Sequence, residues 1–126
     1  MKKLLGKIGV LSLAAVMFLN FSIASASSKP SIDSFSKKTS STITVKVLYD
    51  KYASTKVDIV VSIKDKDTSK TTEQNFNSVK LDSTGYKSVK VDSLTSGTKY
   101  SFKVKVRKHS SGSWSSWSNS QTAKTK

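Results

Sequence analysis

The sequence predicts an all-β chain that folds into a two-sheet sandwich of about seven short strands. After Ala26, apolar and polar residues alternate with a period of two in several stretches, whereas the 3.6-residue period of an amphipathic helix is hard to find. Residues that favour turns separate these stretches at short intervals. Each strand then has one apolar face to cover, which favours two packed sheets over one open sheet.

The predicted strands lie near Ile32 and Phe35, over 43–47 and 57–63, near Phe76 and Val79, and over 89–91, 100–107 and 119–125. The segment 64–72 contains no apolar residue and is expected to be a solvated turn, which leaves only a short edge strand after it. Strand 100–107 is the clearest one. Its inward positions are all apolar or aromatic, and its outward positions are Ser101, Lys103, Lys105 and Arg107. A shift of one residue would bury three cations.

Residues 1–26 are predicted to be a signal peptide that is cleaved, and residues 27–126 to be the mature domain. A basic start at Lys2, Lys3 and Lys7 precedes a mostly apolar run over 8–23, and Ala24-Ser25-Ala26 supplies a small-x-small cleavage site. A retained membrane anchor is the alternative, although the apolar run is short and no basic cluster follows it closely. After cleavage we expect no membrane span.

The sequence contains no cysteine, so the stability of the domain must come from packing rather than from disulfides. The Lys-Lys start and the absence of Asn-x-Ser/Thr sequons after residue 26 favour a bacterial origin. We expect a secreted protein that is released outside the cell or retained at the cell wall, and that is a monomer.

The mature chain is strongly basic. Cleavage removes three lysines and no acid, so 22 basic residues become 19 against 8 acidic ones, a net charge of +11. Such a charge favours anionic partners: a wall polymer of the teichoic type, an acidic glycan, nucleic acid or an anionic lipid surface. The alternative is that lysines on outward strand positions serve solubility alone.

One segment resembles fibronectin type III domains. Leu94-Thr95-Ser96-Gly97-Thr98-Lys99-Tyr100 is similar to the corner between the fifth and sixth strands of that family, with Ser96 where a proline is usual. The resemblance implies that Tyr100 is the corner tyrosine, whose hydroxyl bonds to the backbone of the preceding turn. It also implies that Val47 stands where the family has a core tryptophan, so Tyr86 or Phe102 is expected to fill the volume.

Both tryptophans of the chain lie in Trp114-Ser115-Ser116-Trp117-Ser118, shortly after the only arginine, Arg107. In a polyproline-like conformation, residues three apart face the same side, roughly 9 Å from each other. Alternate residues of a strand recur every ~6.8 Å. Lys103, Lys105 and Arg107 can therefore stack beside and between Trp114 and Trp117 as a cation–π ladder. Packing against the strand is the expected role of the indoles, and direct ligand binding is the alternative.

Trp-Ser-x-Trp-Ser is also similar to the motif of the membrane-proximal domain of class I cytokine receptors, a subset of the fibronectin type III family. That resemblance implies stacking on basic residues of the sixth strand, for which Lys105 and Arg107 are the matching positions. The disulfides and the signalling tail of those receptors have no counterpart here, so the resemblance implies a structural motif and no receptor function.

The sequence predicts neither an enzyme nor a metal or cofactor site. The mature chain has one histidine, His109, one glutamate, Glu73, and no cysteine, so general acid–base and nucleophilic catalysis have few candidate residues. His109 is expected to be a solvated loop histidine. Asp65 and Asp67 have Ca²⁺-ligand chemistry, but adjacent lysines disfavour a cation site.

Three functions follow from these features. The leading interpretation is a non-catalytic module that binds an anionic extracellular polymer or cell surface through a basic face formed by Lys56, Lys64, Lys103, Lys105, Arg107 and Lys108. The second is a protein-recognition domain that uses Tyr49 and Tyr52, aided by Leu48, unless these tyrosines only cover the end of the sandwich. The third is a cationic antibacterial protein, which the lack of an amphipathic helix disfavours.

Overall fold

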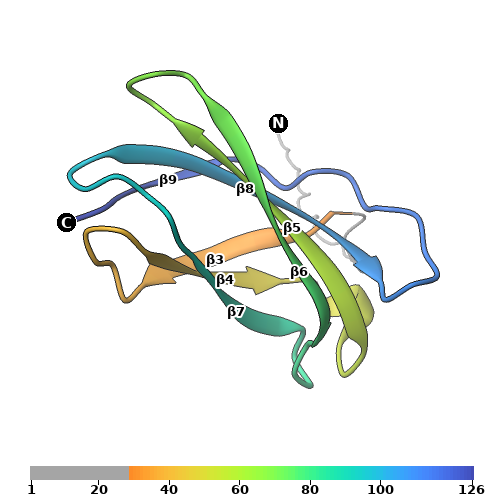
Figure 1. Ribbon diagram of the computed structural model, residues 1–126. Coiled ribbons are helices and arrows are strands. Elements are labelled where there is room, and N and C mark those ends of the chain that lie inside the picture. Colours follow the sequence, from red (N-terminus) through yellow and green to blue (C-terminus); the bar gives the residue numbers. More distant parts are fainter. Residues whose placement is uncertain (1–28) are drawn as a thin grey trace, which may run out of the picture.

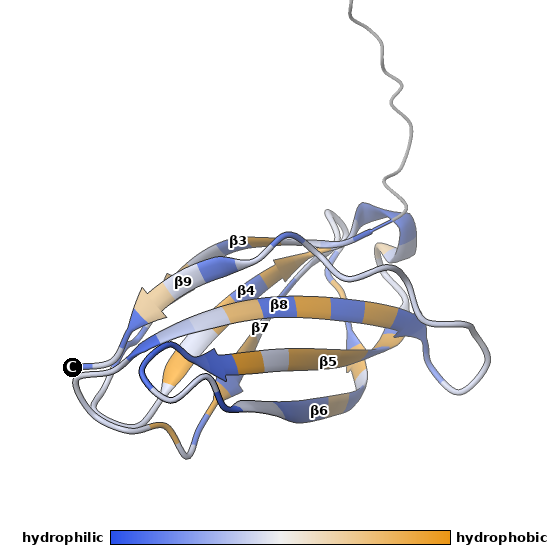
Figure 2. Cartoon of the chain, turned by 90° about the horizontal axis from the view of Figure 1, so that it is seen from above, coloured by the Kyte–Doolittle hydropathy of each residue, from blue (hydrophilic) through white to orange (hydrophobic). Residues whose placement is uncertain are grey.

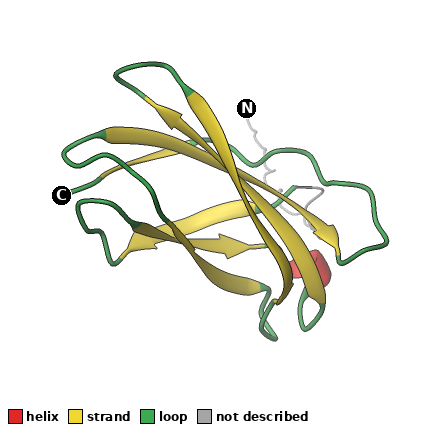
Figure 3. Ribbon diagram, viewed as in Figure 1, coloured by secondary structure: helices red, strands yellow, loops and turns green. Residues whose placement is uncertain are grey.

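The computed structural model describes residues 29–126, which form a two-sheet sandwich (Figures 1 and 3). The strands are β3 (Ser31–Ser36), β4 (Ile43–Leu48), β5 (Lys56–Asp65), β6 (Thr71–Lys80), β7 (Tyr86–Val91), β8 (Lys99–Lys108) and β9 (Gln121–Lys124). A single 3₁₀ turn, Asp50–Tyr52, connects β4 to β5 in this part of the chain. One sheet has the order β3-β4-β7 and the other β6-β5-β8-β9, and all pairs are antiparallel. The predicted all-β sandwich of seven strands is therefore confirmed.

The core lies between the two sheets and consists of the inward positions of both. Its fully buried side chains are Phe102, Ile43, Ile59, Ile63, Leu81, Val45, Val47, Val57, Val61, Val91, Val104 and Val106. Phe102 is the largest of them and packs on Phe35 with a ring-centroid distance of 5.1 Å. Phe102 thus supplies aromatic volume to the core. Tyr86 does not, since it lies half-buried with Lys46 over its ring.

Figure 2 shows that β8 alternates between hydrophilic and hydrophobic residues, whereas β5 is largely hydrophobic. In β8 the inward residues are buried and the outward ones are partly exposed. β5 differs because it is the inner strand of its sheet, between β6 and β8, and is buried on both faces over 57–63. The outward set of β5, namely Asp58, Val60 and Ser62, is therefore covered rather than solvated.

The segment 64–80 corrects the sequence prediction. β6 is ten residues long, not a short strand near Phe76 and Val79, and the expected turn over 64–72 shrinks because β5 reaches Asp65 and β6 begins at Thr71. β6 is an edge strand, so polar residues are tolerated on both of its faces and the apolar alternation fails to reveal it. The last strand starts at Gln121, two residues later than predicted.

No helix in the described part of the chain is long and apolar enough to cross a membrane. The predicted signal peptide, 1–26, lies outside the described residues.

Candidate functional site

Cations and indoles alternate along the outward face of β8. The order is Arg107, Trp114, Lys105, Trp117, Lys103. The Arg107 Cζ lies 4.6 Å from the centroid of Trp114, and the Lys105 Nζ lies 5.1 Å from Trp114 and 4.8 Å from Trp117. The Lys103 Nζ lies 4.9 Å from Trp117. All four distances fall within the ~6 Å range of cation–π contacts, so each indole contacts two cations.

Ser115 and Ser118 hold the tryptophan segment against the part of β8 that β9 does not reach. β9 pairs with β8 only as far as Phe102. Beyond it, the Ser118 N–H donates to the Val104 carbonyl at 2.8 Å, and the Ser118 Oγ accepts from the Val104 N–H at 2.9 Å. Ser115 makes the same two bonds to Val106, at 2.9 and 3.0 Å. The segment therefore satisfies this stretch of the β8 edge without being a strand.

Asp58 is a buried carboxylate that joins three elements, and sequence reasoning missed it. It is 2 % exposed and accepts hydrogen bonds from the Arg107 Nε at 3.0 Å, the His109 Nδ1 at 2.7 Å and the backbone N–H of Ser78 at 2.9 Å. Burial alone would raise the pKa of Asp58, but the bonds from His109, Ser78 and Arg107 outweigh it and hold the pKa well below its ordinary value.

His109 lies in the turn after β8, in agreement with a loop histidine, but its ring is not simply solvated. Its ring is 38 % exposed and is oriented by Asp58. The physical reason is that pairing continues past the end of β8: the His109 N–H donates to the Lys56 carbonyl at 3.0 Å, which brings the ring to the β5 carboxylate. Among residues 29–126, the His109 side chain hydrogen-bonds only to Asp58, so no hydroxyl nucleophile is held against it.

The predicted basic residues do not all share one face. In the β5–β8 register, Lys64 lies opposite Ser101 and Lys103 opposite Ser62. Because strand residues alternate between faces, these two lysines share the outward face with Lys56, Lys105 and Arg107. Lys108 follows Arg107 directly in β8, so its position belongs to the other face. Three cations of this face are engaged as the predicted ladder requires, since Lys103, Lys105 and Arg107 all stack on indoles.

Tyr49 and Tyr52 have different environments. Tyr49 is 3 % exposed and belongs to the core, which favours the interpretation that it covers the end of the sandwich over a contact with a protein partner. Burial, followed by the proximity of Tyr52 and Asp50, raises the pKa of Tyr49. Tyr52 is half-buried and meets Tyr49 edge-on at 5.4 Å. Both tyrosines line a pocket of about 330 Å³ together with Lys51, Val106, Ser113, Trp114, Ser115 and Ser116.

Tyr100 lies at the start of β8, and its hydroxyl oxygen accepts a hydrogen bond from the Thr95 N–H at 2.7 Å. The carbonyl of Thr95 accepts in turn from the Thr125 hydroxyl at 2.6 Å. The turn before β8 is thereby tied both to the core and to the C-terminal segment.

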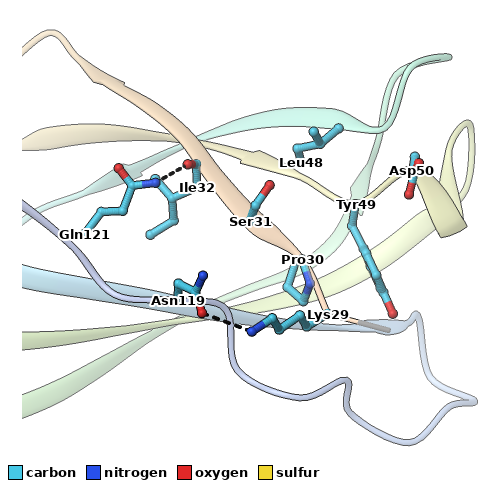
Figure 4. Close-up of a pocket in the computed structure, with 9 residues that line it drawn as sticks. All are labelled: Lys29, Pro30, Ser31, Ile32, Leu48, Tyr49, Asp50, Asn119 and Gln121. Atoms are coloured by element: carbon cyan, nitrogen blue, oxygen red, sulfur yellow. Dashed lines mark hydrogen bonds between the residues drawn. The ribbon is translucent and has the colours of Figure 1, made fainter. Parts of the chain in front are cut away.

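A second pocket, of about 260 Å³, lies where β3 begins (Figure 4). The Lys29 Nζ donates to the Asn119 side-chain oxygen at 3.0 Å, and the Gln121 amide donates to the Ile32 carbonyl at 2.6 Å. These two bonds connect β3 to the segment that leads into β9. Among the described residues, no group of three or more His, Cys, Asp or Glu side chains is placed to hold a metal ion.

Comparison with protein-family models finds no match for this sequence, and comparison with curated proteins finds none either. Solved structures do match in fold. A structure described as a myokine has a TM-score of 0.58 at 18 % identity over 76 % of this chain and 94 % of that one. The alpha chain of the chicken interferon gamma receptor has a TM-score of 0.59 at 9 % identity over 76 % of this chain and 50 % of that one.

The sensor domain of the anti-sigma factor RsgI4 of Pseudobacteroides cellulosolvens has a TM-score of 0.50 at 21 % identity, covering 80 % of this chain and 97 % of that one. At such identities the likeness shows the fold alone, an immunoglobulin-like sandwich of the fibronectin type III kind.

Proposed function

We propose that this protein is a secreted, non-catalytic binding module that associates with an anionic extracellular polymer through the outward face of the β6-β5-β8-β9 sheet. The observation that carries the proposal is the charge of that face. Lys56, Lys64, Lys103, Lys105 and Arg107 lie on it by register. Asp58, which lies among them, is buried and already accepts three hydrogen bonds. Arg107 is paired with Asp58, but the four lysines of the face form no ion pair among the described residues and leave the face positively charged.

The cation–π ladder serves this function as a support, in our proposal. An indole neutralises no charge, so Lys103 and Lys105 stay cationic while Trp114 and Trp117 restrict their side chains. A cation that is ordered before binding loses less side-chain entropy when a ligand arrives. In this interpretation the segment that resembles the receptor motif stabilises the last hairpin and orders the basic face.

The fold of the matched structures agrees with a binding role, since their descriptions include a receptor chain and a sensor domain. A shared sandwich does not transfer a partner, however, because function depends on the site and not on the fold.

The test is a binding assay with heparin and with polyphosphate over a fourfold range of salt. Release of counterions on binding should weaken the affinity about tenfold or more across that range. The double variant Lys56→Gln with Lys64→Gln should weaken binding at any one salt concentration. The matched control is Lys38→Gln with Lys90→Gln, which removes the same charge from exposed positions outside this sheet and should weaken binding less. Affinity that stays constant with salt, or equal losses in both double variants, would contradict the proposal.

A protein-recognition role is the second candidate, and the pocket beside Tyr52 and Trp114 favours it. Aromatic side chains with nearby hydroxyls are typical of recognition surfaces, and this pocket has three serines and Lys51 at its rim. Pull-down from a surface extract should then recover a protein that resists elution by salt. Tyr52→Ser should abolish the recovery, and Tyr86→Ser, on the other sheet, should not.

A further inference from the structure

A polar depression of about 520 Å³ lies on the outward face where β5 ends and β8 begins. Its lining consists of three lysines and four hydroxyl residues, which are Lys64, Lys66, Lys103, Ser62, Thr71, Ser101 and Ser120. We propose that this depression is an oxyanion subsite, which binds a phosphate or sulfate ester group of the polymer. This inference rests on the proposed function and specifies where the polymer is recognised.

The strand register creates an alternating pattern of cations and hydroxyls. Lys64 lies directly opposite Ser101, and Ser62 lies directly opposite Lys103. On the other side of β5, Lys64 pairs with Thr71. Lys64 and Lys103 therefore have hydroxyl residues as their cross-strand neighbours, rather than another lysine or an acid.

The cations of the depression are not used elsewhere as ion pairs. Within residues 29–126, both ion pairs of the protein involve Asp58, at the other end of β5. Glu73 pairs with Ser62 across the β5–β6 register but does not line the depression. The Asp65 carboxylate accepts from the backbone N–H groups of Asp67 and Thr68, at 2.8 and 3.1 Å, and so is directed into its own turn.

The fold holds the ammonium group of one lysine and the backbone of another. The Lys103 Nζ is held 4.9 Å from the Trp117 centroid. The Lys66 N–H donates to the Lys99 carbonyl at 3.0 Å, which ties the β5–β6 turn to the start of β8. Ser62, which also lines the depression, is 5 % exposed. The depression is thus formed before a ligand arrives, which lowers the entropic cost of binding.

The chemistry of the lining selects the class of ligand. Lysine ammonium groups bind phosphate as point charges, and hydroxyls donate to the remaining oxygens. A tetrahedral ester with several free oxygens uses more of these donors than a carboxylate does. The lining contains no aromatic residue, so it lacks the stacking surface that single-stranded nucleic acids use. A phosphorylated or sulfated polymer without bases is the ligand that this site fits.

The experiment titrates the purified protein with polyphosphate, heparin and poly-L-glutamate at one ionic strength. We expect polyphosphate or heparin to bind at least tenfold more tightly than poly-L-glutamate, and the tighter of the two identifies a phosphate or a sulfate source. Lys64→Gln with Lys66→Gln should weaken the tighter interaction about tenfold or more and lower its salt slope by roughly 1 to 2.

The matched control is Lys56→Gln with Lys80→Gln, which removes two exposed lysines that pair across β5 and β6 at the far end of the same sheet. Because Lys56 belongs to the basic face, this variant should still weaken binding, but only about threefold, since it removes general attraction and leaves the depression intact. Ser101→Ala keeps the charge and should cost about two- to tenfold, the usual range for one net hydrogen bond.

Equal losses in the two double variants would overturn the subsite while leaving the basic face as the binding surface. Equal affinity for poly-L-glutamate would overturn the preference for esters. If none of the three polymers binds, the proposed function fails together with the subsite.

Discussion

The Arg107 guanidinium donates through its Nε to Asp58 at 3.0 Å, across 49 positions of sequence, while its Cζ lies 4.6 Å from the centroid of Trp114. One side chain thus joins the buried carboxylate of β5 to the tryptophan segment. Asp58 connects onward to Ser78 in β6 and to His109 after β8. These contacts make the outward face of the sheet a connected network, whose parts can be tested separately.

Asp58→Asn should lower the free energy of unfolding by about 2 to 4 kcal/mol, near the ~3 to 5 kcal/mol typical of breaking a buried pair but reduced because both side-chain partners reach solvent. Arg107 and His109 are 35 % and 38 % exposed. Urea denaturation measures the change. Asp67→Asn, in the exposed β5–β6 turn, is the control and should have almost no effect. Equal midpoints for the two variants would contradict a stabilising role for Asp58.

The lowered pKa of Asp58 predicts how the free energy of unfolding changes at acid pH. Because the folded-state pKa of Asp58 is lowered, its contribution is fully present above the unfolded-state pKa, about 3.9, and is lost as the pH falls from there toward the folded-state value. The difference in free energy of unfolding between wild type and Asp58→Asn should shrink as the pH falls below about 4.

The hydroxyl of Thr84 and the N–H of Tyr86 lower the pKa of Asp82 to about 2. Asp82 therefore makes the free energy of unfolding depend on acid pH in the Asp58→Asn variant as well. Denaturation curves from pH 2 to 7 test both statements. A wild-type-to-variant difference that persists unchanged down to pH 2 would show that Asp58 does not titrate as described.

The serines of the tryptophan segment should differ in importance. Ser118→Ala leaves the buried Val104 N–H without its acceptor and should cost about 1 to 3 kcal/mol. Ser115→Ala should cost less, because the bond from its Oγ to Val106 N–H is only part-buried. Ser116 is exposed, and Ser116→Ala should be nearly neutral. Thermal unfolding of the three variants gives the order, and an equal effect in all three would count against the described bonding.

Two substitutions separate the contributions of packing and of charge to the stability that the cation–π ladder provides. Trp117→Ala should cost about 1 to 4 kcal/mol, as expected for a partly buried large aromatic. Lys105→Met keeps most of the apolar stem opposite Val60 but loses two cation–π contacts, and should cost about 1 to 2 kcal/mol. Unchanged melting of Trp117→Ala together with lost polymer binding would instead assign the indole to the ligand.

Two glycines offer a matched pair. Both have positive φ, +93° at Gly85 and +61° at Gly97. A Cβ at Gly85 would lie 2.7 Å from the Asp50 Cα, whereas a Cβ at Gly97 would meet nothing within 4 Å. Gly97→Ala should therefore cost only the backbone term, about 1 to 2 kcal/mol, and Gly85→Ala distinctly more. The denaturation midpoints of the two variants measure these costs, and equal costs would contradict the close approach of Gly85 to the Asp50 backbone.

The sequence predicts the burial of a residue when that burial follows from the pattern of its own strand, and fails when it depends on a neighbouring strand. The alternation in β4, β5 and β8 predicts their inward faces, because a strand with period two can bury only one set of apolar residues. The length of β6 could not be predicted in this way, because it comes from pairing with β5 and not from an apolar pattern in β6 itself. The pattern also did not predict that Val60, Ser62 and Asp58, on the outward face of β5, are buried. Their burial depends on the position of β5 between β6 and β8.

By itself, the sequence determined the fold class, the inward face of the core strands and the approach of Trp114 and Trp117 to the cations of β8, all of which follow from periodicities of two and three residues. Only the tertiary structure decided that Asp58 is buried with Arg107 and His109, that Tyr49 belongs to the core, and that Lys64, Lys66 and Lys103 line one depression. The physical reason is that strand pairing and the packing of the two sheets bring together side chains that are far apart in the chain, and no local pattern records those contacts.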